Sequence, residues 1–292
     1  MSEAPISYRP ATPADLETCA QILETADDDL NARRNMPSFP RNRPALLKLL
    51  AHILEHHPRR TWMAEASDRA VGFGQAVVYD DLTFLAFLFV LPDVQARGIG
   101  RRLMELSMQG SRYRAVCINS IQPVSTGLYA RDGMVPLVPI YIFLGAPRRS
   151  LPELPAHIEM KHMPADETAE LDREVCGFKR PGDHAWWHKA GRALFGLYES
   201  GKPVGYGYVQ ESGRLGPVVV RAPELLTPFV GGLMSQVPAV EDWMINVPGP
   251  ATDLFVELLN AGMRLEGPPA IYCATEPRID HRRYLPASFA LP

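Results

Sequence analysis

The pattern of apolar and polar residues predicts an alternation of strands and helices along the chain. Apolar residues recur at helical spacing in four segments of the first half, at 14–29, 45–55, 100–109 and 125–131. Shorter runs that alternate in polarity or are continuously apolar predict strands, at 6–9, 62–66, 71–79, 83–91, 115–121 and 138–144. The run at 83–91 is apolar enough to be buried on both faces. This order predicts an α/β architecture in which helices cover both faces of a mixed sheet.

The pattern occurs twice. Three short segments have a counterpart later in the chain, in the same order: Ser67–Gly74 with Ser200–Gly207, Pro13–Asp15 with Pro164–Asp166, and Asp132–Met134 with Ala261–Met263. Both members of the first pair read as a tight polar turn followed by a strand that opens with valine, glycine, an aromatic residue and glycine. We interpret the chain as two copies of one α/β unit.

The length agrees with this interpretation, because 292 residues at about 150 residues per domain predict two domains. We expect the first domain at 1–147 and the second at 156–292. Between them, residues 148–155 are rich in proline and charge and read as a linker.

The composition excludes several classes of function. Lysine and arginine total 30 against 33 for aspartate and glutamate, and a net charge of −3 disfavours a nucleic-acid partner. The longest apolar run, at 84–91, is too short to span a bilayer, and the N-terminus shows no secretory signal. The cysteines are far apart and form no zinc motif or disulfide framework, at Cys19, Cys117, Cys176 and Cys273. We therefore expect a cytoplasmic protein without a metal and without nucleic-acid or membrane partners.

The segment that follows the buried strand carries the clearest chemical signal. Gln95, Gly98 and Gly100 lie in a loop that precedes an apolar helix, and Arg97 and Arg101 place positive charge beside it. Glycines let the backbone approach a ligand closely. Amide N–H groups at a helix N-terminus bind anions. A pyrophosphate group is the ligand that fits this pattern.

This loop resembles the coenzyme A pyrophosphate loop of the GNAT superfamily of N-acetyltransferases, in which the pattern is Gln-x-x-Gly-x-Gly. A second match lies about thirty residues on, where Leu128, Tyr129 and Gly133 repeat the family's L-Y-x-x-x-G, with Met134 in place of phenylalanine. The resemblance implies a tandem GNAT protein whose catalytic domain is 1–147. Each domain is then expected to hold a twisted, mostly antiparallel sheet flanked by helices.

The resemblance also implies roles for individual residues. Acetyl-CoA is the implied cofactor, and its pantetheine arm is expected on the backbone of Leu88, Phe89 and Val90. Its pyrophosphate is expected on the loop and the helix start, at Gln95, Ala96, Arg97, Gly98, Ile99, Gly100 and Arg101. Tyr129 is the implied general acid that protonates the departing thiolate. Asn119 and Gln122 are candidate polar contacts, and Gln122 stands where relatives often place asparagine.

The general base is not identified by the sequence. Many relatives carry a carboxylate on the fourth strand, but residues 83–90 contain none. The alternatives left open are the histidines of the second helix, the acids of the turn before the strand, a water chain or a partly neutral amine; the residues are His52, His56, His57, Asp80 and Asp81. Arginines in the loop at 31–43 either meet a carboxylate on the acceptor or form an exposed basic loop.

The second copy is expected to keep the fold and lose the cofactor. Aligned on the repeat, the glycine loop falls on 225–230, where Pro228 and Val230 replace its two glycines. Proline has no N–H to offer a phosphate, and the branched side chain of valine blocks close approach. Tyr129 falls on Leu258, so the acid is missing too. The aromatic and histidine residues of G-D-H-A-W-W-H-K are expected to pack or be solvated rather than bind a metal, at His184, Trp186, Trp187 and His188.

The sequence thus predicts an acetyl-CoA-dependent N-acetyltransferase. It is expected to move the acetyl group to a primary amine of a small molecule by direct attack in a ternary complex. One alternative is acetylation of a protein N-terminus or lysine, which a strongly charged docking surface would favour and the near-neutral chain does not. Another is a non-catalytic acyl-CoA-binding sensor.

Overall fold

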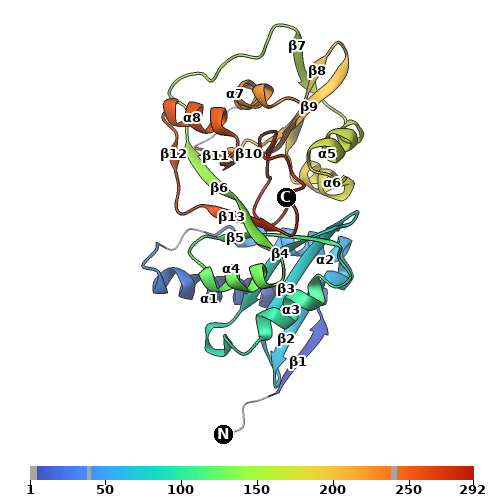
Figure 1. The fold of residues 1–292 in the computed structure, drawn as a ribbon, viewed down its shortest axis with the longest axis vertical. Coiled ribbons are helices and arrows are strands. Elements are labelled where there is room, and N and C mark those ends of the chain that lie inside the picture. The colour runs from blue at the N-terminus through green and yellow to red at the C-terminus, as the bar shows by residue number, and fades with distance from the viewer. Residues whose placement is uncertain (1–4, 38–40, 238–241) are drawn as a thin grey trace. The chain divides into compact units, whose positions relative to one another are not determined.

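The computed structural model describes residues 5–37, 41–237 and 242–292, and it divides into two compact units (Figure 1). Unit 1 comprises residues 1–117 and 121–134, and unit 2 comprises residues 118–120 and 135–292. Each unit is a layered arrangement of helices and a mostly antiparallel sheet, which confirms the predicted fold class. No helix in the described ranges is long and apolar enough to cross a membrane.

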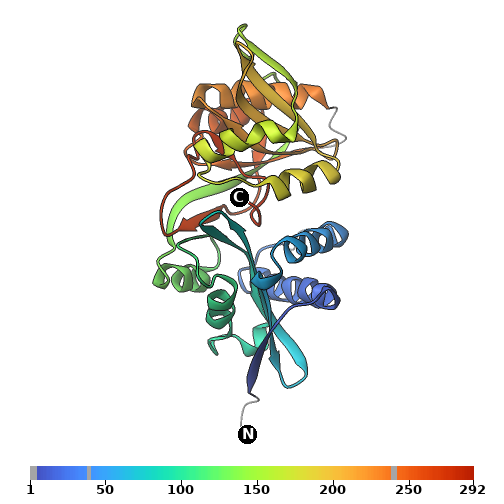
Figure 2. The ribbon, with the colours of Figure 1, turned by 90° about the vertical axis from the view of Figure 1, so that its right-hand side faces the viewer.

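The described residues of unit 1 form five strands in sequential order. They are β1 (Ile6–Pro10), β2 (Thr61–Ala66), β3 (Arg69–Tyr79), β4 (Leu82–Val90) and β5 (Tyr113–Asn119), of which residues 118 and 119 of β5 belong to unit 2. All neighbours pair antiparallel except β4 and β5, which are parallel. The helices are α1 (Leu16–Arg33), α2 (Arg43–His56), α3 (Ile99–Ser107) and α4 (Pro123–Arg131). Helices α1 and α2 cover one face of the sheet and α3 covers the other (Figure 2).

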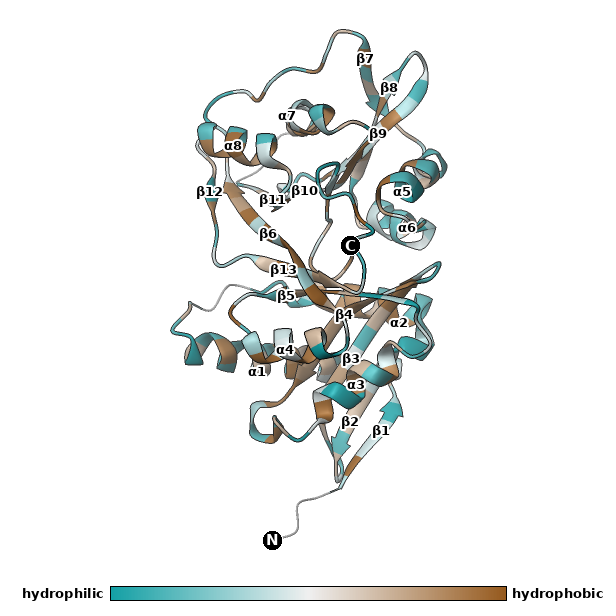
Figure 3. Cartoon of the chain, viewed as in Figure 1, coloured by the Kyte–Doolittle hydropathy of each residue, from teal (hydrophilic) through white to brown (hydrophobic). Residues whose placement is uncertain are grey.

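The core of unit 1 forms between these layers. Phe73 of β3 is fully buried and stacks on Phe89 of β4 at 5.9 Å between ring centroids. Leu50 of α2 and Leu103 of α3 are 1% and 0% exposed and belong to the same cluster. Figure 3 shows the hydrophobic residues concentrated on the central strands. The apolar residues at helical spacing in the sequence therefore lie on the helix faces that pack against the sheet.

Unit 2 repeats this order. Its strands are β6 (Val135–Gly145), β7 (Ile158–His162), β8 (Ala193–Glu199), β9 (Lys202–Val209), β10 (Arg214–Val220), β11 (Trp243–Pro248), β12 (Arg264–Leu265), β13 (Ala270–Ala274) and β14 (Tyr284–Leu285). Its helices are α5 (Ala169–Val175), α6 (Pro181–Lys189), α7 (Leu226–Gln236) and α8 (Thr252–Asn260). The main sheet runs β13-β6-β11-β10-β9-β8-β7, and only β10 and β11 pair parallel.

Strand β6 lies in a different place from the one that the repeat suggests. The sequence predicts it as the last strand of the first copy, at 138–144. In the structure its residues pair antiparallel with β11 along one edge, from Ile140 with Pro248 to Gly145 with Trp243. Strands β12 and β13 pair with it along the other edge. Hydrogen bonding on both edges makes β6 a central strand of unit 2. Its partners are distant in sequence, so the local residue pattern does not predict this position.

The glycines of the repeated motif have the same structural role in both units. A Cβ atom on Gly74 of β3 would lie 2.8 Å from Ser107 Oγ and 3.3 Å from Leu103 Cβ, both on α3. A Cβ atom on Gly207 of β9 would lie 2.5 Å from Leu233 Cδ1 on α7. The absence of a side chain therefore lets the helix that follows the central strand pack directly on the sheet.

Gly74→Ala is expected to lower the stability of the protein by about 1–3 kcal/mol, because the new methyl group overpacks the α3 interface. Thermal unfolding measures the change. The matched control is Gly127→Ala on α4, where an added Cβ meets nothing within 4 Å and the helix gains about 0.5–1 kcal/mol. Equal effects of the two substitutions would contradict the close approach of α3.

The segment predicted as a linker, 148–155, packs within unit 2. We call residues 146–154 the strap. Arg148 N–H donates to Ala261 O at 2.7 Å, and Leu151 is 7% exposed. The strap crosses α7 at a glycine pair, because a Cβ on Gly231 would lie 2.9 Å from Leu151 Cβ.

Candidate active site

The fourth strand of unit 1 separates from its neighbour halfway along its length. In the described structure, β4 pairs with β5 only from Leu82 with Tyr113 to Leu85 with Val116. Its register with β3 also shifts there, since Gln75 pairs with Phe87 while Ala76 pairs with Leu85. The extra residue is Ala86, a β-bulge that bends the strand. Residues 82–85 of β4 are buried, whereas residues 86–90 are partly exposed.

The predicted pantetheine residues lie on this separated part of β4. Leu88, Phe89 and Val90 pair with β3 along one edge. The opposite edge, toward β5, lies beyond the last β4–β5 pair. Backbone N–H and C=O groups on such an edge are hydrogen-bonding positions for an extended ligand. The sequence did not indicate the bulge, although a small alanine among aromatic and aliphatic residues marks its position.

The predicted pyrophosphate loop follows directly from this strand. A 3-10 turn, Pro92–Val94, leads to Gln95, whose Nε2 donates to Val90 O at 2.9 Å and holds the loop against the strand end. Ala96 and Gly98 have φ of +64° and +79°. Gly98 is the N-cap of α3, and a Cβ there would meet nothing within 4 Å. Glycine is therefore required at Gly98 for its left-handed backbone and not for lack of space.

The first turn of α3 presents amide N–H groups that have no intrahelical partner. Ile99 is buried and anchors the turn, and Gly100 has only Val90 Cγ2 near its Cβ position, at 3.8 Å. Arg101 is exposed and pairs with Glu105 at 3.0 Å, while Arg97 is half-buried. The helix N-terminus carries the positive end of the helix dipole, has open space beside Gly98 and has cationic neighbours. Anion sites in proteins share these features.

The other predicted site residues are placed on or near α4. Tyr129 lies within α4 and is 4% exposed. Gln122 is the N-cap of that helix, and its carbonyl accepts from Thr126 N–H and Oγ1, both at 3.2 Å. Asn119 is the exposed last residue of β5 and belongs to unit 2.

The candidate bases lie at the end of α2 and in the β3–β4 turn. His52 is buried at 5% exposure, with its ring centroid 4.4 Å from that of His56. His56 Nδ1 lies 2.9 Å from His52 O. His57 Nδ1 accepts from Val78 N–H at 3.4 Å. Asp80 and Asp81 are exposed in the β3–β4 turn. The histidines thus contact their own helix or β3, and the general base stays unassigned.

Two arginines at and just before the start of α2 pair with acids of α1. Residues 38–40, between these two helices, lie outside the described ranges. Arg41 pairs with Asp27 at 2.6 Å and with Asp28 at 2.7 Å, and the hydrogen bonds to these carboxylates raise the pKa of Arg41. Arg43 pairs with Glu17 at 2.9 Å. Their charges are therefore balanced within unit 1.

The corresponding region of unit 2 has a different local structure. The 3-10 turn Pro223–Leu225 leads straight into α7, and Leu225 at the N-cap has φ of −80°, in the right-handed region. Residues 226–230 are all buried. Pro228 thus lies in a buried first turn, and no glycine loop separates the strand from the helix within this described segment.

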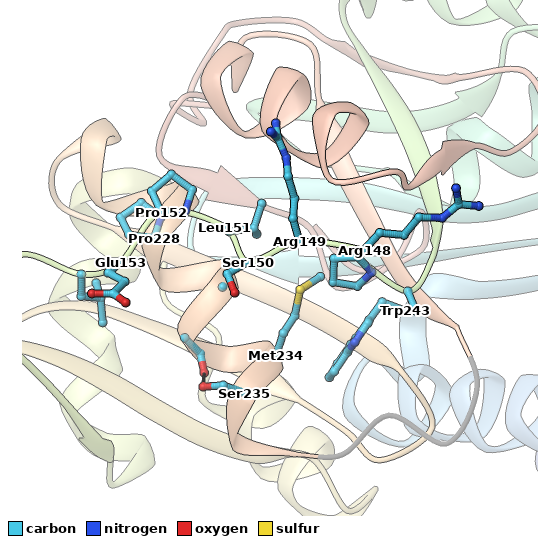
Figure 4. A pocket seen from close by; sticks show the side chains of 15 residues that line it. Arg148, Arg149, Ser150, Leu151, Pro152, Glu153, Pro228, Met234, Ser235 and Trp243 are labelled. Carbon is cyan, nitrogen blue, oxygen red and sulfur yellow. Dashed lines mark hydrogen bonds between the residues drawn. The ribbon is translucent and has the colours of Figure 1, made fainter.

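A cavity of about 750 Å³ lies between the strap and α7 in unit 2 (Figure 4). Met234, Ser235 and Trp243 line it opposite the strap. Arg149 extends away from it toward Glu257, at 3.8 Å. Within the described ranges no cluster of three histidine, cysteine or acidic residues could hold a metal, here or elsewhere. All the residues that line the cavity belong to unit 2.

Comparison with known proteins finds a family match for part of the chain. Residues 21–133 match the model of the acetyltransferase (GNAT) family. The matched range contains the bulged β4, the glycine loop, α3 and Tyr129. No curated protein matches the chain. The match indicates a domain of the acetyltransferase type at residues 21–133.

Solved structures show the same fold over both units. An acetyltransferase candidate from Pyrococcus horikoshii is 19% identical with a TM-score of 0.76, covering 100% of this chain and 98% of its own. A GCN5-related N-acetyltransferase from Sphaerobacter thermophilus is 16% identical with a TM-score of 0.60, covering 95% and 98%. A tandem GNAT protein of the clavulanic acid biosynthesis pathway is 18% identical with a TM-score of 0.59, covering 94% and 99%. The likeness spans nearly all of each chain, so both units share the fold of these structures.

Proposed function

We propose that unit 1 transfers the acetyl group of acetyl-CoA to a primary amine of a small molecule. The observation that carries the proposal is the path of β4, which leaves β5 at Leu85 and runs into the Gln95–Gly98 loop at the start of α3. One continuous stretch of backbone thus offers strand-edge groups for an extended arm and helix amides for a phosphate.

The residues fit acetyl-CoA in chemistry and space. The loop at 95–101 would hold the pyrophosphate through amide N–H groups, and Gly98 leaves the approach open because a Cβ there meets nothing within 4 Å. Residues 88–90 would hold the pantetheine through the backbone. Asn119 and Gln122 stay predictions as further polar contacts.

Besides binding acetyl-CoA, the protein would supply a hydrogen-bond donor to the thioester carbonyl and a general acid. Acetyl-CoA supplies the activated thioester when bound. A backbone amide of residues 88–90 would donate to the carbonyl oxygen, as an oxyanion hole does. The Tyr129 hydroxyl would give its proton to the departing sulfur, a general-acid role. The proton of the attacking amine leaves to water in this scheme, because no carboxylate lies on β4.

The charge distribution supports a small acceptor. Arg33, Arg41 and Arg43 pair with acids of α1, and the chain carries a net charge of −3. A protein acceptor is guided by a patch of one charge, and these features do not provide one. A thiol-release assay with a panel of amines and peptides tests this choice. Release with peptides alone would contradict it, and tight acetyl-CoA binding without release on any amine would favour the sensor.

Calorimetry with acetyl-CoA is expected to show one site per chain. Gly98→Pro is expected to weaken binding about 100-fold or more, because proline fixes φ near −65° and cannot adopt the +79° of Gly98. The lost amide contacts to a charged phosphate account for the size of the effect.

The matched control is Pro228→Ala at the corresponding position of unit 2, which is expected to leave the affinity unchanged. Thermal unfolding of both variants verifies that they fold. Unchanged affinity in a folded Gly98→Pro protein would refute the assignment of this loop.

A further inference from the structure

Strand β10 of unit 2 separates from β11 as β4 separates from β5. Among the described residues, it pairs with β11 only at Arg214 with Met244 and at Leu215 with Ile245. Its register with β9 shifts between Leu215 and Val218, which is a bulge at the position that matches the β4 bulge. Unit 2 therefore keeps the divided strand pair even though its glycine loop is gone.

A strand from the end of the sequence lies in this gap. Val218 and Val219 of β10 pair with β9 along one edge. The same two residues pair antiparallel with Leu285 and Tyr284 of β14, which must use the opposite edge. Val220 N–H continues the pairing by donating to Arg283 O at 2.9 Å. Since the opposite edge of β10 is the one that faces β11, β14 is inserted between β10 and β11.

The residues that follow β14 are held in the interior of unit 2. Leu285 and Leu291 are fully buried and Ala287 is 1% exposed. Ser288 Oγ accepts from Ala290 N–H at 3.2 Å and from Leu291 N–H at 3.1 Å, which turns the chain back toward α6.

One buried side chain contacts both ends of this segment. Arg180, at the N-cap of α6, donates from Nη1 to Tyr284 Oη at 3.1 Å and to the main-chain oxygen of Pro292. Its Nη2 donates to Tyr206 Oη at 2.8 Å. Asp172 of α5 balances its charge at 3.0 Å, and both side chains are 0% exposed. The buried guanidinium of Arg180 holds its partners in one geometry, because the loss of any of these contacts would leave part of a buried charge without a partner.

We propose that residues 284–292 are an intramolecular peptide ligand of unit 2. They add a strand to β10 in the gap that corresponds to the acetyl-CoA position proposed for unit 1, and they keep acyl-CoA out of it. That this gap corresponds to the acetyl-CoA position of unit 1 rests on the proposed function. The location of residues 284–292 beside β10 rests on the observed strand pairing. Strand addition with buried side chains is a standard mode of peptide recognition, so unit 2 serves as a peptide-binding module occupied in cis.

The chemistry of the gap favours a peptide over acyl-CoA. Unit 1 offers helix amides at a left-handed glycine, but the start of α7 is apolar and buried. The guanidinium of Arg180 faces a phenol and a main-chain oxygen, and Asp172 pairs with its charge. A pyrophosphate would find no open cationic or amide site at these described groups, while an extended apolar segment satisfies them all.

Hydrogen exchange of the intact protein, measured with and without acetyl-CoA, tests the proposal. We expect slow exchange of the Leu285, Val218 and Val220 amides, which face the β10–β14 pairing, and we expect acetyl-CoA to leave it unchanged. Exchange of residues 284–292 at the rate of a free peptide would overturn the proposal, and so would their release on adding acetyl-CoA. Calorimetry separates the two claims: two acetyl-CoA sites would overturn this proposal, and no site would overturn the proposed function alone.

Substitution and complementation give a second test. Leu291→Ala is expected to lower Tm by about 5–15 °C, because it opens a cavity at a fully buried position. Leu259→Ala on α8 is the control, since Leu259 is 44% exposed.

A chain that ends at Arg283 is expected to recover Tm when the peptide YLPASFALP is added, but not with a scrambled peptide. Equal Tm for Leu291→Ala and the wild-type protein would overturn the seating of the segment, whether or not the shortened chain folds.

Discussion

Tyr129→Phe is expected to lower kcat about 10²- to 10³-fold while acetyl-CoA affinity changes little. The phenol supplies the proton that makes the thiolate a good leaving group, and a positioned general acid contributes about this much. Tyr129 is 4% exposed, so phenylalanine fills nearly the same volume and preserves the packing of α4. Thiol release at saturating acetyl-CoA and amine measures kcat, and calorimetry measures the affinity.

Tyr113→Phe on β5 is the matched control. Tyr113 is also buried, at 9% exposure, and Arg112 lies 5.0 Å above its ring, a contact that phenylalanine retains. We expect this variant to keep the wild-type kcat. If Tyr129→Phe also keeps it, Tyr129 is a core aromatic and the acid lies elsewhere.

Asp172→Ala is expected to destabilise unit 2 by about 3–5 kcal/mol, because it leaves a buried guanidinium without its counter-charge. The carboxylate accepts from Arg180 Nε at 3.1 Å, contacts His184 Nε2 at 2.8 Å, and also accepts from Tyr206. Denaturant unfolding measures the loss. Glu170→Ala on the same helix is the control, since its pair with Arg173 is 70% and 56% exposed and exposed pairs contribute about 0–1 kcal/mol. Similar losses for the two variants would contradict a special role for the buried pair.

The same carboxylate makes stability depend on pH. Burial raises the pKa of Asp172, but the Arg180 charge and the hydrogen bonds from His184 and Tyr206 outweigh it, so the pKa lies below its usual value. A carboxyl whose pKa is lowered by folding stabilises the protein above the unfolded value of about 3.9. This stability is lost as the pH falls through the lower folded pKa. We expect Asp172→Asn to show a shallower loss of stability between about pH 4 and pH 2 than the wild-type protein.

The sequence predicted the features that depend on local patterns. Strand and helix positions in unit 1 follow from periodicity, and the glycine loop follows from Gly98 and Gly100 before an apolar helix. The degeneracy of the second loop follows from Pro228, which the structure places in a buried helical turn. Trp187 and His184 are buried, as expected of packing residues.

The features that the sequence did not predict depend on contacts between distant residues. Nothing near Arg180 indicates that it meets Tyr284 and Pro292, because these residues come together only through the sheet. The strap reads as a linker from its prolines, yet Leu151 has a place to pack because α7 has a glycine at Gly231. The pairing of β6 with β11 likewise depends on which strand edge β6 meets, and the residue pattern of β6 does not specify that edge.

The position of β6 has a consequence for the order of synthesis. Val135–Gly145 leaves the ribosome roughly a hundred residues before Trp243–Pro248, the strand it must pair with. At about 5–20 residues per second, an apolar strand waits roughly 5–20 s with both edges unsatisfied. Such a strand is prone to pair with another nascent chain. The yield of native protein should therefore fall when translation between the two strands is slowed, and it should recover when a chaperone shields the waiting strand.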